Sequence, residues 1–131
     1  MKLDLLLTKV PQRITSQRSA WLGGKYETFR LNFEIPAARM HQHGTSPLGS
    51  WYAVDEYNLS VAEYHNRYAL LAKQRRPQLE LVVLVPGTTV NVGKANRQGA
   101  AAGGGLQFEV LPGSPQPRFT EHADNPRRVR Y

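Results

Sequence analysis

Residues 103–113 read Gly-Gly-Gly-Leu-Gln-Phe-Glu-Val-Leu-Pro-Gly, a glycine-rich loop that runs into a short strand. Because alternate side chains of a strand share a face, Gln107 and Glu109 point to one side while the strand's apolar residues point to the other. An amide and a carboxylate therefore lie side by side on a frame that apolar residues anchor. This arrangement favours chemistry or recognition over packing, and it makes Gln107 and Glu109 the first candidate catalytic residues.

Working outward from this strand, the chain predicts further strands and one helix. Residues 79–85 are rich in β-branched residues and predict a central strand covered on both faces, followed by a Pro86-Gly87 turn and a strand at 88–92. Residues 58–76 carry apolar side chains at helical spacing and end before Pro77, which predicts the main helix. The remaining strands are expected at 3–9, at 26–35, where Pro36 ends the strand, at 50–54 and at 118–121. We therefore predict an α+β fold of compact, mostly antiparallel, twisted β-sheets with one main helix.

The length, composition and net charge limit the classes of protein to which this chain can belong. A single domain is expected over residues 1–131, with residues 123–131 as a flexible basic tail. No apolar run approaches the roughly 18 to 20 residues of a membrane-spanning helix, so no membrane partner is expected. The absence of cysteine excludes disulfides, thiolate metal ligands and cysteine nucleophiles. The net charge of +7 attracts nucleic acid, an anionic membrane surface or an acidic protein, although a soluble basic protein without such a partner has the same composition.

An aromatic cluster lies before and within the expected helix. Ser50, Trp51 and Tyr52 begin a strand, and Tyr64 lies on the helix that follows. These rings either pack in the core or stack on a flat ligand ring such as nicotinamide or a base. Upstream, His43 belongs to a His-x-His pair that lacks a third metal ligand at short spacing, so we assign no metal. His43 is then either an ordinary solvated loop histidine or an imidazole that contacts a ligand.

The order of these motifs resembles the ADP-ribosyltransferase superfamily. The segment Gly49–Ala53 and the helix residues Ala62–Tyr64 are similar to the nicotinamide-pocket strand and helix of its diphtheria-toxin-like and poly-ADP-ribose polymerase members. Gln107-Phe108-Glu109 resembles the Gln/Glu-x-Glu strand of the arginine-serine-glutamate branch. The resemblance covers residues 49–121 and implies an ADP-ribosyltransferase-like fold with NAD as substrate, a catalytic Glu109 and an acceptor-positioning Gln107.

The resemblance also implies a residue near the amino terminus that anchors NAD. Arg13, Arg30 and His43 are the candidates, and the two arginines are preferred. The nicotinamide–ribose bond would break through an oxocarbenium-like transition state, which a fixed carboxylate stabilises. The resemblance thus implies an NAD-dependent mono-ADP-ribosyltransferase or NAD-hydrolysing toxin-like enzyme. It would modify a protein or RNA acceptor in the cytoplasm, arrive there as part of a secreted toxin and be neutralised by an immunity protein. The residues around the nicotinamide and ribose would be Ser50, Trp51, Tyr52 and Tyr64.

Two other classes stay open. A metal-independent ribonuclease toxin would draw its general acid and base from His41, His43, His122 and Glu109. A non-enzymatic basic domain that binds nucleic acid or protein would need only its surface charge, and its binding would depend steeply on salt. Release of nicotinamide from NAD would distinguish the ADP-ribosyltransferase class from both of these.

Overall fold

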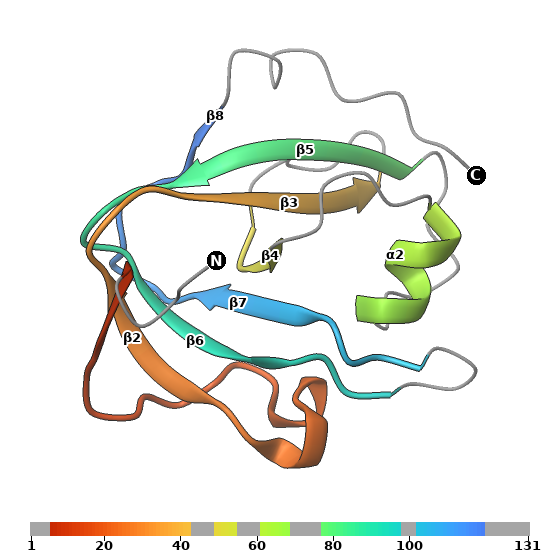
Figure 1. Ribbon diagram of the computed structural model, residues 1–131, viewed down its shortest axis with the longest axis horizontal. Helices are drawn as coiled ribbons and strands as arrows, with labels where there is room; N and C mark the ends of the chain where they lie inside the picture. The colour runs from red at the N-terminus through yellow and green to blue at the C-terminus, as the bar shows by residue number, and fades with distance from the viewer. Residues whose placement is uncertain (1–5, 43–48, 55–60, 69–76, 98–101, 120–131) are drawn as a thin grey trace.

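The computed structural model describes residues 6–42, 49–54, 61–68, 77–97 and 102–119 (Figure 1). Within these ranges the chain forms an eight-stranded sheet in the order β1-β2-β6-β7-β4-β3-β5-β8, with antiparallel neighbours throughout. The other described elements are one α-helix and two short 3₁₀ turns, α2 (Val61–Tyr68), η1 (Arg18–Ala20) and η2 (Leu22–Gly24). The strands are β1 (Leu7–Lys9), β2 (Glu27–Leu31), β3 (Ile35–Gln42), β4 (Trp51–Val54), β5 (Pro77–Leu84), β6 (Thr89–Lys94), β7 (Leu106–Val110) and β8 (Arg118–Phe119).

The sheet bends over itself, so that β3 and β5 lie across from β6 and β7, with α2 at one open end (Figure 1). Strand alternation sends one set of side chains inward. β7 contributes Phe108 to this inner face, whereas Gln107 and Glu109 lie on the outer face of the same strand. The core that results consists of Leu7, Leu31, Ile35, Ala37, Tyr52, Val54, Val82, Leu84, Val90 and Phe108.

The chain between β1 and β2, residues 10–26, packs on the outer face of β6 and β7, and we call it the covering segment (Figure 1). Trp21 bridges to Ala95 just beyond β6. Gly93 makes room for this packing, because a Cβ there would lie 2.7 Å from the Trp21 ring and 2.8 Å from the carbonyl oxygen of Lys25. The fold therefore places a covering layer directly over the strand that carries Gln107 and Glu109.

The glycine run before β7 docks on α2. The N–H groups of Gly103 and Gly105 donate to the carbonyls of Asn66 and Arg67, at 2.7 and 2.9 Å. A Cβ on Gly105 would lie 2.5 Å from the ring of Tyr68, so only glycine fits against that ring. These glycines fix the start of β7 to the helix.

The expected mostly antiparallel β architecture is confirmed, and the described residues contain very little helix. Strands occur where they were predicted near 50–54, 88–92, 106–111 and 118–121. The strand expected at 3–9 covers only Leu7–Lys9 of the described residues. Of the helix predicted at 58–76, the structure describes 61–68 as α2, and the predicted tail at 123–131 lies outside the described residues. No helix in the described ranges is long and apolar enough to span a membrane.

The prediction of one strand over 26–35 was wrong. β2 ends at Leu31, the chain bends at 32–33, and β3 begins at Ile35 and continues through Pro36. Phe33 is 58% exposed because it lies in this bend. Proline is tolerated at the second residue of β3, close to the end of the strand.

The strand predicted at 79–85 is present as β5, but the prediction that it is central and covered on both faces was wrong. β5 lies between β3 and the two-residue β8, next to the edge of the sheet. Val82 and Leu84 are buried in the core, while Leu81 and Val83 are only half-buried on the other face. A run of β-branched residues does not distinguish a central strand from a strand next to the edge of the sheet, because such residues are found in both.

Candidate active site

Gln107 and Glu109 share the outer face of β7, as the alternation of the strand predicts. The antiparallel register places Asn91 of β6 and Trp51 of β4 opposite Glu109, and Thr28 of β2 opposite Asn91. Directly paired residues lie on the same face of a sheet. Thr28, Asn91, Glu109 and Trp51 therefore form one row across four strands beneath the covering segment.

The Glu109 carboxylate is 1% exposed, and four donors surround it. The Thr15 hydroxyl and the Asn91 amide donate to Oε1, at 2.8 and 3.0 Å. The backbone N–H of Ser16 donates to Oε2 at 3.0 Å, and the Ser16 hydroxyl donates to the same oxygen. Burial alone would raise the pKa of Glu109, but the hydrogen bonds from Ser16, Asn91 and Thr15 outweigh it and lower that pKa. The site thus contains a buried carboxylate that stays ionised.

The same network ties the covering segment to the sheet. The Asn91 side-chain oxygen accepts from the Thr28 hydroxyl at 2.6 Å, and that hydroxyl accepts from the backbone N–H of Arg13 at 2.9 Å. The Gln107 amide donates to the carbonyl of Ala20 at 2.9 Å. Gln107 and Glu109 therefore contact opposite halves of the covering segment.

Aromatic rings complete the layer above Glu109. Trp21 is fully buried, and its indole N–H donates to the Thr15 hydroxyl at 2.8 Å. Its ring stacks on Tyr26, with centroids 5.5 Å apart, and meets Trp51 at 5.4 Å and 51°. Trp51, predicted to hold a ligand ring, thus lies on the Glu109 face and contacts Trp21.

Tyr52 lies on the opposite face of the sheet from Glu109, in the core. Its hydroxyl accepts from the N–H of Gly49 at 3.3 Å. Burial raises the pKa of Tyr52, against the opposing effects of the Gly49 hydrogen bond and the Arg39 charge. Tyr52 and Glu109 are therefore not brought together on one face.

Arg39 of β3 lies near Tyr52. It was not identified from the sequence as a candidate residue. Its guanidinium donates to the carbonyl of Trp51 at 3.4 Å, while its buried Nε has no hydrogen-bond partner among the described residues. Burial lowers the pKa of Arg39, and the nearby Tyr52 raises it only in part. Gly49 allows the close approach, since a Cβ there would lie 2.4 Å from the guanidinium carbon. The strand at 35–42 was missed in the sequence, and Arg39 with it.

The two preferred arginines lie on the Glu109 side of the sheet. Arg13 is exposed, and its backbone joins the network through Thr28. Arg30 is exposed two residues after Thr28 on β2, so it shares the face of Thr28. Ser50 is exposed, and its carbonyl accepts from Val110. His43 and the side chain of Tyr64 lie outside the described residues.

Thr15, Ser16, Thr28 and Asn91 are site residues that the sequence did not reveal. The sequence around Asn91 gives one indication of its place, because a polar residue between two valines of a strand lies on the face opposite to theirs. Thr15 and Ser16 lie in a segment without periodicity, so the sequence gives no indication that they contact Glu109. Among the described residues, no three His, Cys, Asp or Glu side chains gather in a way that could hold a metal ion.

No protein-family model matches the sequence, and no curated protein matches it at a significant level. The chain is similar to a solved structure, that of Tne2 in complex with Tni2, with a TM-score of 0.69 and 16% sequence identity. The similarity covers 85% of this chain and 98% of the other. At this identity it shows a shared fold alone.

Proposed function

We propose that this chain is an NAD-consuming enzyme of the ADP-ribosyltransferase type, with the outer face of β7 as its active site. The observation that carries the proposal is the Glu109 carboxylate, buried and ionised beside Gln107 on one strand face. The enzyme would break the nicotinamide–ribose bond of NAD. It would pass ADP-ribose to a protein or nucleic-acid acceptor, or to water.

A fixed carboxylate suits this reaction because positive charge develops on the ribose as nicotinamide leaves. A negative charge that is already oriented stabilises that transition state without reorganisation. The lowered pKa of Glu109 keeps the group charged at neutral pH, and its burial strengthens the interaction relative to water. Gln107, two residues away on the same face, would position the acceptor.

Two of the donors to Glu109 are hydroxyls, the kind of donor that a ribose offers with its 2′ and 3′ positions. The Ser16 hydroxyl belongs to an exposed residue, whereas Thr15 is buried. The ribose would therefore approach from the Ser16 side and replace the Ser16 hydroxyl at Oε2. Arg13 is exposed on the same side and would bind the diphosphate.

A protein partner that neutralises the enzyme, an immunity protein, is part of the same proposal. The similar structure is that of a complex of Tne2 with Tni2, which supports a protein partner for this fold. An enzyme that consumes NAD in the cytoplasm of a target cell would need such a partner in the cell that makes it.

The experiment is nicotinamide release from NAD by the purified full chain. Glu109→Gln keeps the shape of the side chain and removes its charge, so it is expected to lower kcat/KM by at least about a hundredfold. Labelled NAD with protein or RNA acceptors then separates transfer from hydrolysis.

Glu34→Gln is the matched control, because it makes the same substitution at an exposed glutamate that lies outside the site and pairs with Arg118. It is expected to keep both activity and stability. Equal losses of activity in the two variants would mean that the loss does not depend on the Glu109 charge. RNA cleavage in the absence of NAD, without nicotinamide release, would overturn the proposal in favour of a ribonuclease.

A further inference from the structure

The outward side of the covering segment exposes apolar side chains. Ile14 is 90% exposed and Leu22 is 46% exposed. Ile14 comes directly before Thr15 and Ser16, which hold Glu109. One side of this short stretch therefore contacts the candidate site, while the other presents an aliphatic side chain to solvent.

Cations lie on the same segment as these apolar residues. Arg18 and Lys25 lie against the glycines of η2. A Cβ added to Gly24 would lie 3.4 Å from the Arg18 side chain, and one added to Gly23 would lie 3.8 Å from the Lys25 side chain. Both side chains thus lie at the turn that carries Leu22. Residues 10–26 include Arg13, Arg18 and Lys25 and no Asp or Glu.

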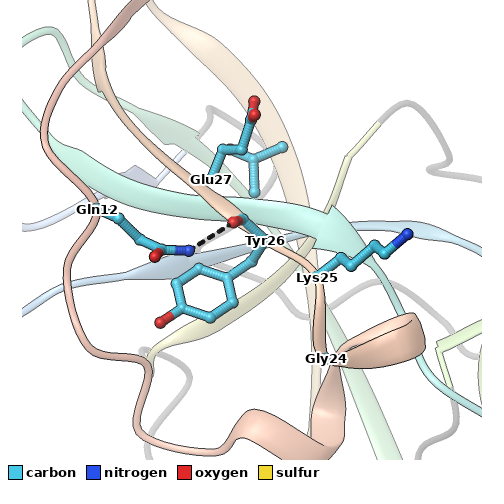
Figure 2. Close-up of a pocket in the computed structure, with 6 residues that line it drawn as sticks. Gln12, Gly24, Lys25, Tyr26 and Glu27 are labelled. Carbon is cyan, nitrogen blue, oxygen red and sulfur yellow. Dashed lines mark hydrogen bonds between the residues drawn. The ribbon is translucent and has the colours of Figure 1, made fainter.

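A hollow of about 520 Å³ opens at the base of the covering segment (Figure 2). Its lining includes Lys25, Tyr26 and Glu27, whose carboxylate pairs with Lys9 at 3.3 Å. The Gln12 amide donates to the carbonyl of Tyr26 at 3.0 Å. The covering segment therefore exposes an isoleucine, carries Arg18 and Lys25 at η2 and borders a concave region. Exposed apolar side chains together with arginine and tyrosine are found at protein–protein contacts.

We propose that the exposed side of the covering segment, with Ile14, Arg18, Leu22, Lys25 and the hollow, docks an acidic protein whose apolar side chains cover Ile14. Charge argues against a second copy of this chain, because each copy carries +7. Nucleic acid matches the cations but offers no apolar side chain to cover an isoleucine, and an anionic membrane requires a broader apolar face than one isoleucine and one partly exposed leucine. The partner would lie directly over the segment that holds Glu109.

Binding of the full chain to poly(Glu,Tyr), an acidic copolymer with apolar rings, tests the surface without any substrate. Its outcome is therefore independent of whether NAD is consumed. Ile14→Ser is expected to weaken binding about tenfold, the effect of losing the burial of one aliphatic side chain. Arg18→Gln is expected to weaken it about threefold and to reduce its salt dependence. Hydrogen exchange should slow within residues 10–26.

Two controls match these changes elsewhere on the surface. Phe33→Ser removes an apolar side chain that is 58% exposed, and Arg118→Gln removes a cation on β8. Both are expected to leave binding unchanged, with thermal unfolding confirming that every variant is folded. The proposal is overturned if the controls weaken binding equally or if the copolymer does not bind at low salt. It is also overturned if poly(U) or phosphatidylserine vesicles bind more tightly than the copolymer and Ile14→Ser does not affect them.

Discussion

At the scale of single residues, Glu109 shows how a buried charge is retained. Removing a carboxylate from water is costly, and an uncompensated one takes up a proton instead. Here the donors from Thr15, Ser16 and Asn91 occupy both oxygens, so the charged form is favoured in the folded state. Protonation would leave those donors facing a neutral acid, and the covering segment would lose its charge-assisted hydrogen bonds to the sheet.

Stability should therefore fall with acid in a way that depends on Glu109. Its folded pKa is lowered, so its contribution is fully present above the unfolded value of about 4.3 and is lost as pH falls through the lower folded pKa. Urea unfolding at pH 7, 5, 4 and 3 measures this loss. Glu109→Gln should be less stable at pH 7, and its difference from the natural chain should shrink toward pH 3. A constant difference across the series would contradict the assignment.

At the scale of elements, alternation along β7 was enough to place Gln107 and Glu109 on one face. Alternation alone could not tell which residues of other strands share that face, because this depends on register. The register places Trp51 on the Glu109 face and Tyr52 in the core. It therefore separates Tyr52 from Glu109, although both were expected to contact NAD. The covering segment was not predictable, since it has no periodicity and its partners on β7 lie about ninety residues away in sequence.

The contact between β6 and the covering segment gives a prediction for Gly93→Ala. The added methyl group would meet the Trp21 ring and the Lys25 carbonyl, and backbone cannot move aside as a flexible side chain can. We expect a loss of about 1–3 kcal/mol in the free energy of unfolding and a change in tryptophan fluorescence as Trp21 shifts. Lys94→Ala, at the exposed next position of β6, is the control and should be close to neutral. Unchanged stability in Gly93→Ala would mean that the segment packs more loosely than described.

At the scale of the whole molecule, the two halves of the bent sheet share one core. Strands distant in sequence pair with each other, as β2 does with β6 and β3 with β5. The core cluster takes residues from both halves, including Val82 of β5 and Val90 of β6. Neither half can keep its apolar face covered without the other, which favours unfolding in a single cooperative step.

Val82→Ala and Val90→Ala test this cooperativity from opposite sides of the core. Both valines are fully buried, so each substitution should cost about 2 kcal/mol, from lost burial and the cavity left behind. Far-UV circular dichroism and tryptophan fluorescence should report one shared transition, shifted to lower temperature in both variants. Phe33→Ala, at an exposed bend, should leave the midpoint nearly unchanged. If Val82→Ala shifted only the circular dichroism transition and left that of the tryptophans in place, the two halves would unfold separately. The shared core would then not be what holds the covering segment over Glu109.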